Sequence, residues 1–404
     1  MTSDGPRVAV LGAGIMGACL ALYLARRGAA VTLFDQATRP LEGASRWNEG
    51  KIHLGYLYSA DASLRTARHV MPGGLLFRPL VEDLIAGDIA AVITPQDDLY
   101  LCHRDSVVPP EAMAAYMENV TALLREHPDA RRYLADTFGA RLERLDAAAL
   151  AAVSGSPAIV AGFRVPERSV ETTWIADRLA AALAAEPRIA LHMATRVTAV
   201  AAPDGGTAGP WRVETAAGRF DGFGFVINAL WEGRLAIDRT VGLAPPAEWS
   251  HRYRESLFLR TARPLDTPCA VIATGPFGDV KNYNGRDFYL SWYPDGLRCD
   301  SADVAPPEPS RWERPRPPDL AAAVLGHLQE HLPWIADIGA NIERVHIGGG
   351  WVFAAGRGAL SAPASSLHRR ADYGVQRVGT YLSIDTGKYS TAPWLAREVA
   401  EALF

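Results

Sequence analysis

A glycine-rich turn between an apolar run and a helix constrains the fold of this chain more than any other feature. Residues 7–11 are mostly β-branched and apolar, residues 15–27 carry small and apolar side chains at helical spacing, and a second apolar run, 30–34, ends at Asp35. The three glycines of the turn, in the spacing G-x-G-x-x-G, are Gly12, Gly14 and Gly17. This order predicts a strand–helix–strand unit of a parallel sheet.

The glycine turn predicts a site for an adenine dinucleotide. Gly12 permits the sharp turn, Gly14 lets the backbone approach a pyrophosphate, and Gly17 lets the helix and the strand pack closely. The start of the helix supplies free N–H groups and a partial positive charge for the phosphates. Asp35 stands where a carboxylate accepts hydrogen bonds from the adenosine ribose, and an acid there disfavours the 2′-phosphate of NADP.

FAD and NAD both fit this turn, but the rest of the chain departs from the pattern of an NAD domain. An NAD domain continues with alternating strands and helices, whereas here a long polar loop follows Asp35 and strand patterns return near residues 189 and 342. A proline-rich stretch, 304–318, predicts a surface connection. The expected helices span 61–70, 75–85, 111–126, 173–185, 319–332 and 391–403, and the expected strands span 189–192, 195–200, 211–215, 223–228, 252–260, 270–273, 280–283, 288–293, 342–347 and 381–384.

Composition excludes several classes of protein. The 404 residues are 49% hydrophobic and 21% charged, which is typical of a globular chain of two or three domains. A net charge of −4 gives no basic surface for nucleic acid or an acidic membrane. The four cysteines are far apart in the sequence and form no C-x-x-C pair, so we expect no disulfide framework and no zinc site. Because no apolar run reaches about 20 residues and no targeting signal is visible, we expect no membrane span and a cytoplasmic protein.

Lysine is scarce in this chain. Only Lys51, Lys281 and Lys388 stand against 38 arginines. Such a bias converts most surface cations to arginine, so a retained lysine is a candidate for a position that needs a compact charge on a flexible stem.

Several segments resemble the flavoprotein family of D-amino acid oxidase, glycine oxidase and sarcosine oxidase. The specific part covers residues 8–50: V-A-V-L-G-A-G-I-M-G at 8–17, and S-R-W-N-E-G at 45–50, which is similar to the family's S-x-x-N-x-G loop over the flavin. The segment 226–231 is similar to a strand end that usually carries glycine where this chain has Leu230. The segment 385–393 resembles the family's segment before the last helix.

The resemblance implies an α/β fold with a discontinuous Rossmann-like FAD-binding domain and a mixed α+β substrate domain built on an antiparallel-rich sheet. We divide the chain into residues 1–86, 146–232 and 340–404 for FAD, and 87–145 and 233–339 for substrate. Non-covalent FAD is expected, because Gly348 to Gly350 stand where sarcosine oxidases carry the attaching cysteine. The implied cofactor-binding residues are Gly12, Ala13, Gly14, Ile15, Met16, Gly17, Asp35, Gln36, Ser45, Arg46, Trp47, Asn48, Glu49, Gly50, Lys51, Val197, Ala229, Leu230, Trp231, Gly387, Lys388, Tyr389, Ser390 and Thr391.

The charge of a reduced flavin also favours the C-terminal part of that set. Reduced flavin carries negative charge at N1 and the C2 carbonyl, and it needs fixed positive potential there. A helix that begins near Thr391, with Lys388 beside it, supplies this potential.

The activity implied by the resemblance is oxidation of an amine or amino acid to an imine by hydride transfer to flavin N5. The partners are then a small-molecule substrate and O2 or another electron acceptor, in a protein of bacterial type. The candidate catalytic residues are Lys51, His53, Tyr293 and Arg298, the last standing where sarcosine oxidases use an oxygen-activating lysine.

Other interpretations of these residues stay open. His53 is equally consistent with a structural histidine. Core packing is the favoured interpretation of the aromatic strand residues Tyr289, Trp292 and Tyr293, and a solvated surface is favoured for the pair Arg369-Arg370. Two alternative functions also remain. One is a flavin-dependent hydroxylase or desaturase acting on a specialised metabolite, and the other is a flavin-binding subunit without a catalytic cleft.

Overall fold

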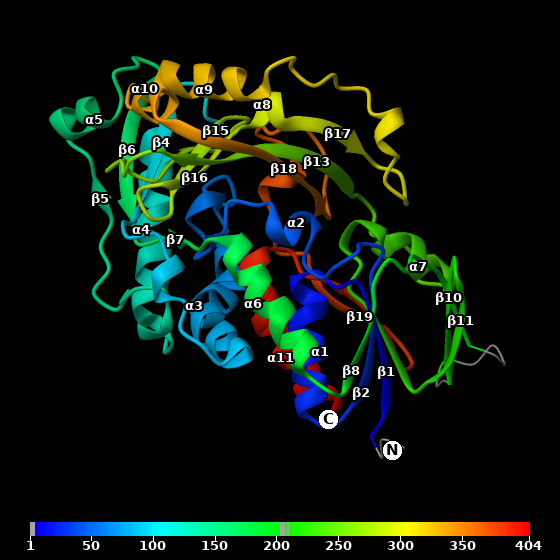
Figure 1. Cartoon of the computed structure of the whole chain (residues 1–404). Coiled ribbons are helices and arrows are strands. Elements are labelled where there is room, and N and C mark those ends of the chain that lie inside the picture. Colours follow the sequence, from blue (N-terminus) through cyan, green and yellow to red (C-terminus); the bar gives the residue numbers. More distant parts are fainter. Residues whose placement is uncertain (1–4, 203–206, 208–209) are drawn as a thin grey trace.

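The computed structural model describes residues 5–202, 207 and 210–404. Its N-terminal strand lies inside a six-stranded sheet (Figure 1) with the order β19-β20-β12-β1-β2-β8. Five neighbouring strands are parallel, and only β19 runs antiparallel to β20. Strands from three distant parts of the chain are therefore neighbours in this sheet. Their bounds are β1 Arg7–Leu11, β2 Ala30–Phe34, β8 Ile189–His192, β12 Phe225–Asn228, β19 Gly374–Val378 and β20 Tyr381–Asp385.

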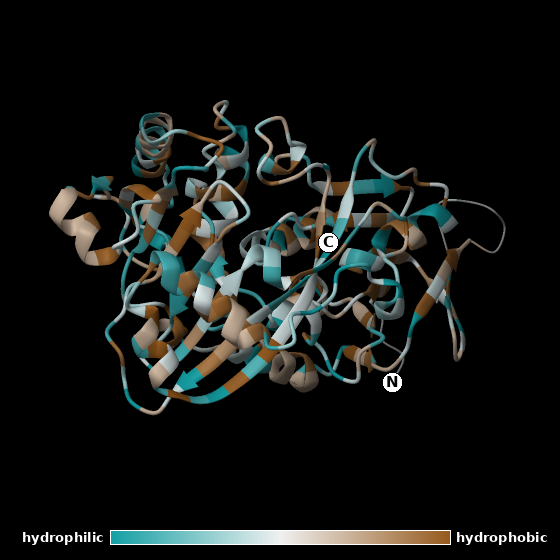
Figure 2. Cartoon of the chain, turned by 90° about the horizontal axis from the view of Figure 1, so that it is seen from above, coloured by the Kyte–Doolittle hydropathy of each residue, from teal (hydrophilic) through white to brown (hydrophobic). Residues whose placement is uncertain are grey.

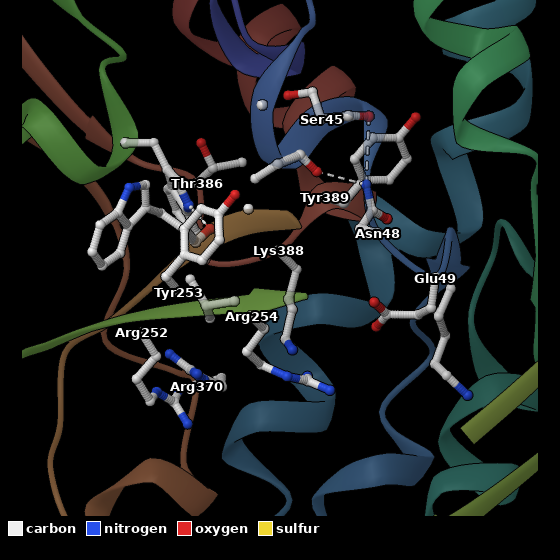
Figure 3. Close-up of a pocket in the computed structure, with 18 of the residues that line it drawn as sticks. Ser45, Asn48, Glu49, Arg252, Tyr253, Arg254, Arg370, Thr386, Lys388 and Tyr389 are labelled. Carbon is white, nitrogen blue, oxygen red and sulfur yellow. Dashed lines mark hydrogen bonds between the residues drawn. The ribbon is translucent and has the colours of Figure 1, made fainter. Parts of the chain in front are cut away.

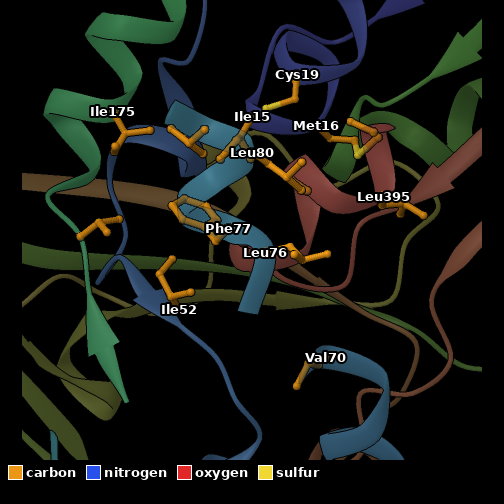
Figure 4. Packing of buried hydrophobic residues seen from close by; sticks show 14 of the residues in the cluster. Ile15, Met16, Cys19, Ile52, Val70, Leu76, Phe77, Leu80, Ile175 and Leu395 are labelled. Carbon is orange, nitrogen blue, oxygen red and sulfur yellow. The ribbon is translucent and has the colours of Figure 1, made fainter. Parts of the chain in front are cut away.

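Helices cover one face of this sheet. Helix α1 packs against α3, α6 and α11, and their side chains form the largest apolar core (Figure 4). A three-stranded antiparallel sheet, β9 to β11, lies on the other side, with α7 packed against β9. The bounds are α1 Ile15–Arg26, α3 Arg65–Ile85, α6 Thr172–Ala185, α11 Ala392–Leu403, α7 Arg234–Thr240, β9 Val197–Ala201, β10 Trp211–Thr215 and β11 Gly218–Phe223.

The second large sheet has nine strands and is mostly antiparallel. Its long strands β13 and β18 pair along their whole lengths, and α9 covers one face over β16. Figure 2 shows hydrophobic residues, in brown, alternating with hydrophilic ones along strands and helices, as elements with one buried face require. The bounds are β4 Asp98–His103, β5 Glu143–Arg144, β6 Ile159–Val165, β13 Ser250–Thr261, β14 Ala270–Ala273, β15 Gly278–Asn282, β16 Asp287–Trp292, β17 Leu297–Ser301, β18 Ile342–Ala354, α9 Leu320–His331 and α10 Ile335–Ala340.

Short elements complete the described chain. A two-stranded ladder joins β3 to β7, and helix α4 packs against α3. The bounds are α2 Gly43–Arg46, β3 Lys51–Ile52, α4 Pro110–Glu126, α5 Ala147–Val153, β7 Arg168–Ser169 and α8 Tyr293–Gly296. Among the described residues, no helix combines the length and the apolar character that a bilayer span requires.

The predicted fold class is confirmed, and most elements lie within two residues of their predicted bounds. Two predictions of single elements were wrong. Residues 61–70 and 75–85 do not form two helices, because α3 continues through Pro72 and Pro79. Glycines explain how this helix packs: a Cβ on Gly73 would meet Thr391 Cα at 2.7 Å, and one on Gly74 would meet the His53 carbonyl at 2.1 Å.

The second difference concerns β18, which extends to Ala354 instead of ending at residue 347. Its partner β13 is equally long, so pairing continues through the three glycines that break the apolar pattern. The domain boundaries given above remain a proposal. The strands β6 and β18, which those boundaries group with the FAD-binding segments, are paired into the nine-stranded sheet.

Candidate active site

A cavity of about 570 Å³ lies between the six-stranded and the nine-stranded sheets (Figure 3). One end is lined by the turn after β1 and the end of β2, the middle by residues from 42 to 53, and the other end by β13 and by segments around 350, 370 and 387. This volume is within the range of sites that hold cofactors and small ligands.

Two glycines of the turn at the first end leave no room for a Cβ atom. Gly12 has φ +96°, and a Cβ there would meet the Ala229 carbonyl oxygen at 2.6 Å. A Cβ on Gly17 would meet the Gly12 oxygen at 1.8 Å. The N-cap residue of α1 is Gly14, so no N-cap side chain accepts a hydrogen bond from the first N–H groups of this helix. The Ile15 N–H donates to Ser45 Oγ at 2.8 Å. The turn therefore presents backbone N–H groups and one hydroxyl to the cavity.

Two acids lie at this end. The Asp35 carboxylate accepts hydrogen bonds from the Ala13 and Ala37 N–H groups at 2.7 and 2.8 Å. Burial raises its pKa, although both hydrogen bonds oppose the rise. Glu232 also lines the cavity, and burial, with the backbone hydrogen bond opposing and the Asp35 charge assisting, raises its pKa to about 7.

The loop after α2 is fixed by its own polar side chains and by the second sheet. Asn48 donates to the Ala44 carbonyl at 2.8 Å and accepts from the Gly50 N–H at 2.8 Å. A Cβ on Gly348 would meet the Trp47 ring at 2.7 Å, and one on Gly350 would meet Ala44 Cα at 2.6 Å. The glycines of β18 therefore let this loop rest on the nine-stranded sheet.

A buried group of two lysines and two carboxylates lies beside the cavity. We call Lys51, Lys281, Asp98 and Glu167 the lysine–carboxylate cluster. Lys51 and Lys281 each donate to Asp98 Oδ2 at 2.6 Å, and Glu167 accepts from the Tyr100 hydroxyl and from the Leu54 N–H. All four are at most 3% exposed.

Lys51 is held as a cation in this cluster. Burial alone would lower its pKa, but the charges of Asp98 and Glu167 outweigh burial and raise the pKa above its usual range. Lys51 therefore cannot accept a proton near neutral pH. It lines the cavity, while Lys281 lies fully buried behind it.

His53 is buried and neutral. Burial, reinforced by the charge of Lys388 and the other nearby cations, holds its pKa well below the usual range. Its Nδ1 has no hydrogen-bond partner among the described residues. An imidazole of this kind can accept a hydrogen bond from a ligand, but it is a weak base.

A second group of cations converges at the far end of the cavity. We call Arg252, Arg254, Arg370 and Lys388 the cationic cluster; Figure 3 shows Arg252 beside Arg370 and Arg254 beside Lys388, away from Ser45. Tyr293 stands between the two arginines of β13. Its hydroxyl accepts from Arg252 at 2.9 Å, and the Arg254 guanidinium lies 4.6 Å from its ring centroid.

The positive charges of this cluster repel one another, and burial together with this repulsion lowers the pKa of Lys388 and of Arg370. Burial, followed by the charge of Arg370, lowers the pKa of Lys388 to about 7. Burial and the charge of Arg252 likewise lower the pKa of Arg370 to about 10. Two acids, Glu49 and Asp279, lie nearby. The neighbouring cations, Lys388 first, lower the pKa of Glu49, although burial opposes this. Burial and the charge of Glu49 raise the pKa of Asp279.

The structure brings most of the predicted residues to this cavity. Those that line it are Gly12, Gly14, Ile15, Met16, Asp35, Gln36, Ser45, Asn48, Glu49, Lys51, His53, Ala229, Leu230, Trp231, Tyr293, Gly387, Lys388 and Tyr389. Those that do not are Ala13, Gly17, Arg46, Trp47, Gly50, Val197, Arg298, Ser390 and Thr391. Arg298 lies on β17 and pairs with Glu255 at 3.6 Å, so its side chain is directed to a neighbour on β13.

The sequence interpretation missed three arginines. Arg370 is a wall of the cavity and donates to the Phe353 carbonyl at 3.1 Å, so the solvated interpretation fails for it, while Arg369 is exposed. Arg252 and Arg254 carried one available signal, because residues two apart on a predicted strand share a face. Tyr289, interpreted as core, also lines the cavity.

Comparison with known proteins places the chain among flavin enzymes. A family model described as "DAO: FAD dependent oxidoreductase" matches residues 7–401. An iminodiacetate oxidase from Chelativorans sp. BNC1 superposes with a TM-score of 0.68 at 15% identity, covering 98% of this chain and 95% of that one. Glycine oxidase from Geobacillus kaustophilus gives 0.66 at 17% identity, covering 98% and 94%. L-α-glycerophosphate oxidase from Mycoplasma pneumoniae gives 0.59 at 14% identity, covering 99% and 95%.

Proposed function

The chain belongs to the DAO family of FAD-dependent oxidoreductases, and from this premise we propose that it oxidises the C–N bond of an amine or amino-acid-like substrate to an imine. In this reaction the substrate carbon loses its hydrogen with two electrons, and the nitrogen loses a proton. Bound FAD supplies the acceptor for the two electrons.

The residues around the cavity fit non-covalent FAD. The turn from Gly12 to Gly17, in which Gly12 and Gly17 leave no room for a Cβ, offers N–H groups to a diphosphate, and Asp35 offers a carboxylate to the ribose. In the proposal, residues from Ser45 to Lys51 and from Gly387 to Tyr389 hold the ring system, and Lys388 supplies positive charge beside it. All four cysteines are buried, and the described residues that line the cavity include no cysteine.

One observation carries the proposal: a single cavity joins the glycine turn to the cationic cluster. A dinucleotide with its diphosphate at Gly14 then has its reactive end near side chains that can orient an acidic substrate. Arginine is suited to this task because its planar fork matches a carboxylate. Two structural neighbours, glycine oxidase and iminodiacetate oxidase, are named after amine substrates.

Anaerobic titration of the flavin-loaded protein tests the proposal. We expect amines or amino acids from a panel to bleach the oxidised flavin spectrum, with formation of the matching carbonyl product after imine hydrolysis. Alcohols and 2-hydroxy acids of the same shape serve as controls for C–O oxidation. If only the alcohols, or only reduced nicotinamide, bleach the flavin, C–N oxidation is wrong.

A further inference from the structure

We propose that this cavity selects a substrate with two acidic groups, one held by Arg252 and Arg370 and the other by Arg254 and Lys388. The inference rests on the proposed function and narrows it from amines in general to amines that carry two anionic groups. The observations that support it are the charge balance of the cavity, the unused donors of its cations, and the separation of the two pairs.

The first observation is the excess of positive charge. The cationic cluster contributes four cations, and the acids at the same end of the cavity are Glu49 and Asp279. Within the described residues, no carboxylate oxygen lies within 4.0 Å of a nitrogen of Arg252, Arg254, Arg370 or Lys388. With both acids ionised and Lys388 protonated, the excess is two positive charges. A buried charge without a partner destabilises the protein. An anion that binds beside these cations removes a large part of that cost, and this favours its binding.

The second observation is that donors in this cavity are unused. The Nε atoms of Arg252 and Arg254 are buried without a hydrogen-bond partner among the described residues, and so is the hydroxyl of Tyr58. The bonds that the arginines do make go to neutral groups: Arg252 to the Tyr293 hydroxyl, Arg254 to Ser291 Oγ at 3.3 Å, and Arg370 to a carbonyl. Guanidinium groups in this state retain N–H groups for a ligand.

The third observation separates the cations into two pairs. Arg252 and Arg254 leave the same face of β13, about 7 Å apart along an extended strand. Tyr293 keeps them apart, because Arg252 bonds its hydroxyl while Arg254 lies over its ring. Figure 3 shows Arg370 on the side of Arg252 and Lys388 on the side of Arg254. One carboxylate can satisfy one such pair, so two pairs suit two acidic groups.

A binding experiment tests this without turnover. The flavin-loaded protein is titrated with glutarate and with butyrate, which have similar length but two acidic groups or one, and binding is followed by the flavin absorbance and by calorimetry. We expect glutarate to bind at least 10-fold more tightly than butyrate. Phosphono- and sulfo-analogues of glutarate, included as further arms, identify the kind of second group that the site accepts.

Substitutions sharpen the test. In Arg252→Met and Arg370→Met we expect glutarate affinity to fall about 10- to 100-fold, the loss typical of a hydrogen bond to a charged group, so that the ratio to butyrate approaches one. The matched control is Arg260→Met, on the same strand but paired with Asp287 at 2.6 Å, and this variant should keep the ratio of the unaltered protein.

The outcomes separate this inference from the proposed function. A ratio near one in the unaltered protein overturns the two-acid inference, whether or not the variants fold. If glutarate binds tightly but no amine bleaches the flavin, the proposed function fails and the anion site stands. If monocarboxylic amines reduce the flavin with the same kcat/KM as dicarboxylic amines, the proposed function stands and the two-acid inference fails.

Discussion

The lysine–carboxylate cluster and the cationic cluster lie beside the same cavity, yet their charges are balanced in opposite ways. In the first, Lys51 and Lys281 share Asp98, and Glu167 lies 3.8 Å from Lys51, so two cations face two anions. In the second, four cations face Glu49 and Asp279 at longer range. The charges of the first group are balanced within the chain, whereas the second has an excess of positive charge that an anionic ligand would balance.

The comparison teaches which buried charges serve structure and which serve binding. A satisfied ion pair inside a protein contributes little net stability but is costly to break, because the remaining partner stays buried. A buried charge that has no partner already destabilises the ligand-free protein in this way. Removal of a charge should therefore destabilise the first cluster and leave the second nearly unchanged.

The largest effect is expected for Asp98→Asn. This change leaves two buried lysines without the carboxylate that both contact, and it should lower the free energy of unfolding by about 3–5 kcal/mol. Denaturant unfolding of the flavin-loaded protein measures it. Asp287→Asn, which breaks the more exposed pair with Arg260, is the control and should cost no more than about 1 kcal/mol. Equal losses in the two variants would contradict the structural role of the first cluster.

Lys281→Met should have a smaller effect in the same direction. Asp98 keeps Lys51 as a partner, so we expect a loss of about 2 kcal/mol, comparable to that of one buried hydrogen bond to a charged group. The same unfolding measurement applies. Because Lys281 does not line the cavity, glutarate affinity should be retained, and a 10-fold loss of affinity would show that the two clusters are coupled.

Arg252→Met tests the opposite behaviour of the cationic cluster. Without ligand, its free energy of unfolding should lie within about 1 kcal/mol of the unaltered protein, because the lost bond to Tyr293 is offset by relief of repulsion from Arg370. The same concentration of glutarate should raise the melting temperature of the unaltered protein by more than that of the variant. If Arg252→Met lost as much free energy of unfolding as Asp98→Asn, Arg252 would have a structural role like that of the lysine–carboxylate cluster.

The pH dependence of Lys388 gives the smallest effect. Its pKa is about 7 in the folded chain against 10.5 in its ordinary state, so the unfolded chain binds more protons between these values and stability should rise with pH across this window. Since the cavity is open to solvent, we expect a rise of at most about 1 kcal/mol. Lys388→Met should lack the rise, and thermal unfolding between pH 7 and 9 measures both.

Anion binding should respond to the same titration with the opposite sign. Lys388 is cationic below pH 7 and loses its charge above it, so glutarate affinity should weaken as pH rises through about 7. Lys388→Arg keeps the charge and should remove this decline. An unchanged pH profile in Lys388→Arg would exclude Lys388 from the anion site.

Local sequence features predicted much of the fold. The strand and helix around Gly12, Gly14 and Gly17 lie as predicted, and a Cβ on Gly12 or Gly17 would collide with a backbone carbonyl oxygen. The boundaries of α3 failed for the opposite reason. Pro72 and the glycines after it interrupt the local helical signal, but packing against Thr391 and His53 keeps the helix continuous.

The candidate site was predictable only where a motif marks it. The patterns of segments 45–50 and 387–391 pointed to the cavity, which Ser45, Asn48, Glu49 and residues 387–389 line, whereas Arg370 was interpreted as solvated because its neighbours are polar. Nothing local indicates that Arg370 lies beside Arg252, which is more than 100 residues away in the chain.

The sequence by itself determined the glycine turn, the cofactor class that such a turn accepts, and a scarcity of lysine that singles out three positions. Only the tertiary structure decided what those lysines do: Lys51 and Lys281 share a buried carboxylate, while Lys388 joins three arginines that form no ion pair with any of the described carboxylates. The physical reason is that the effect of a charge depends on its distance to other charges and on its burial. Both are set by which distant segments the two sheets bring together.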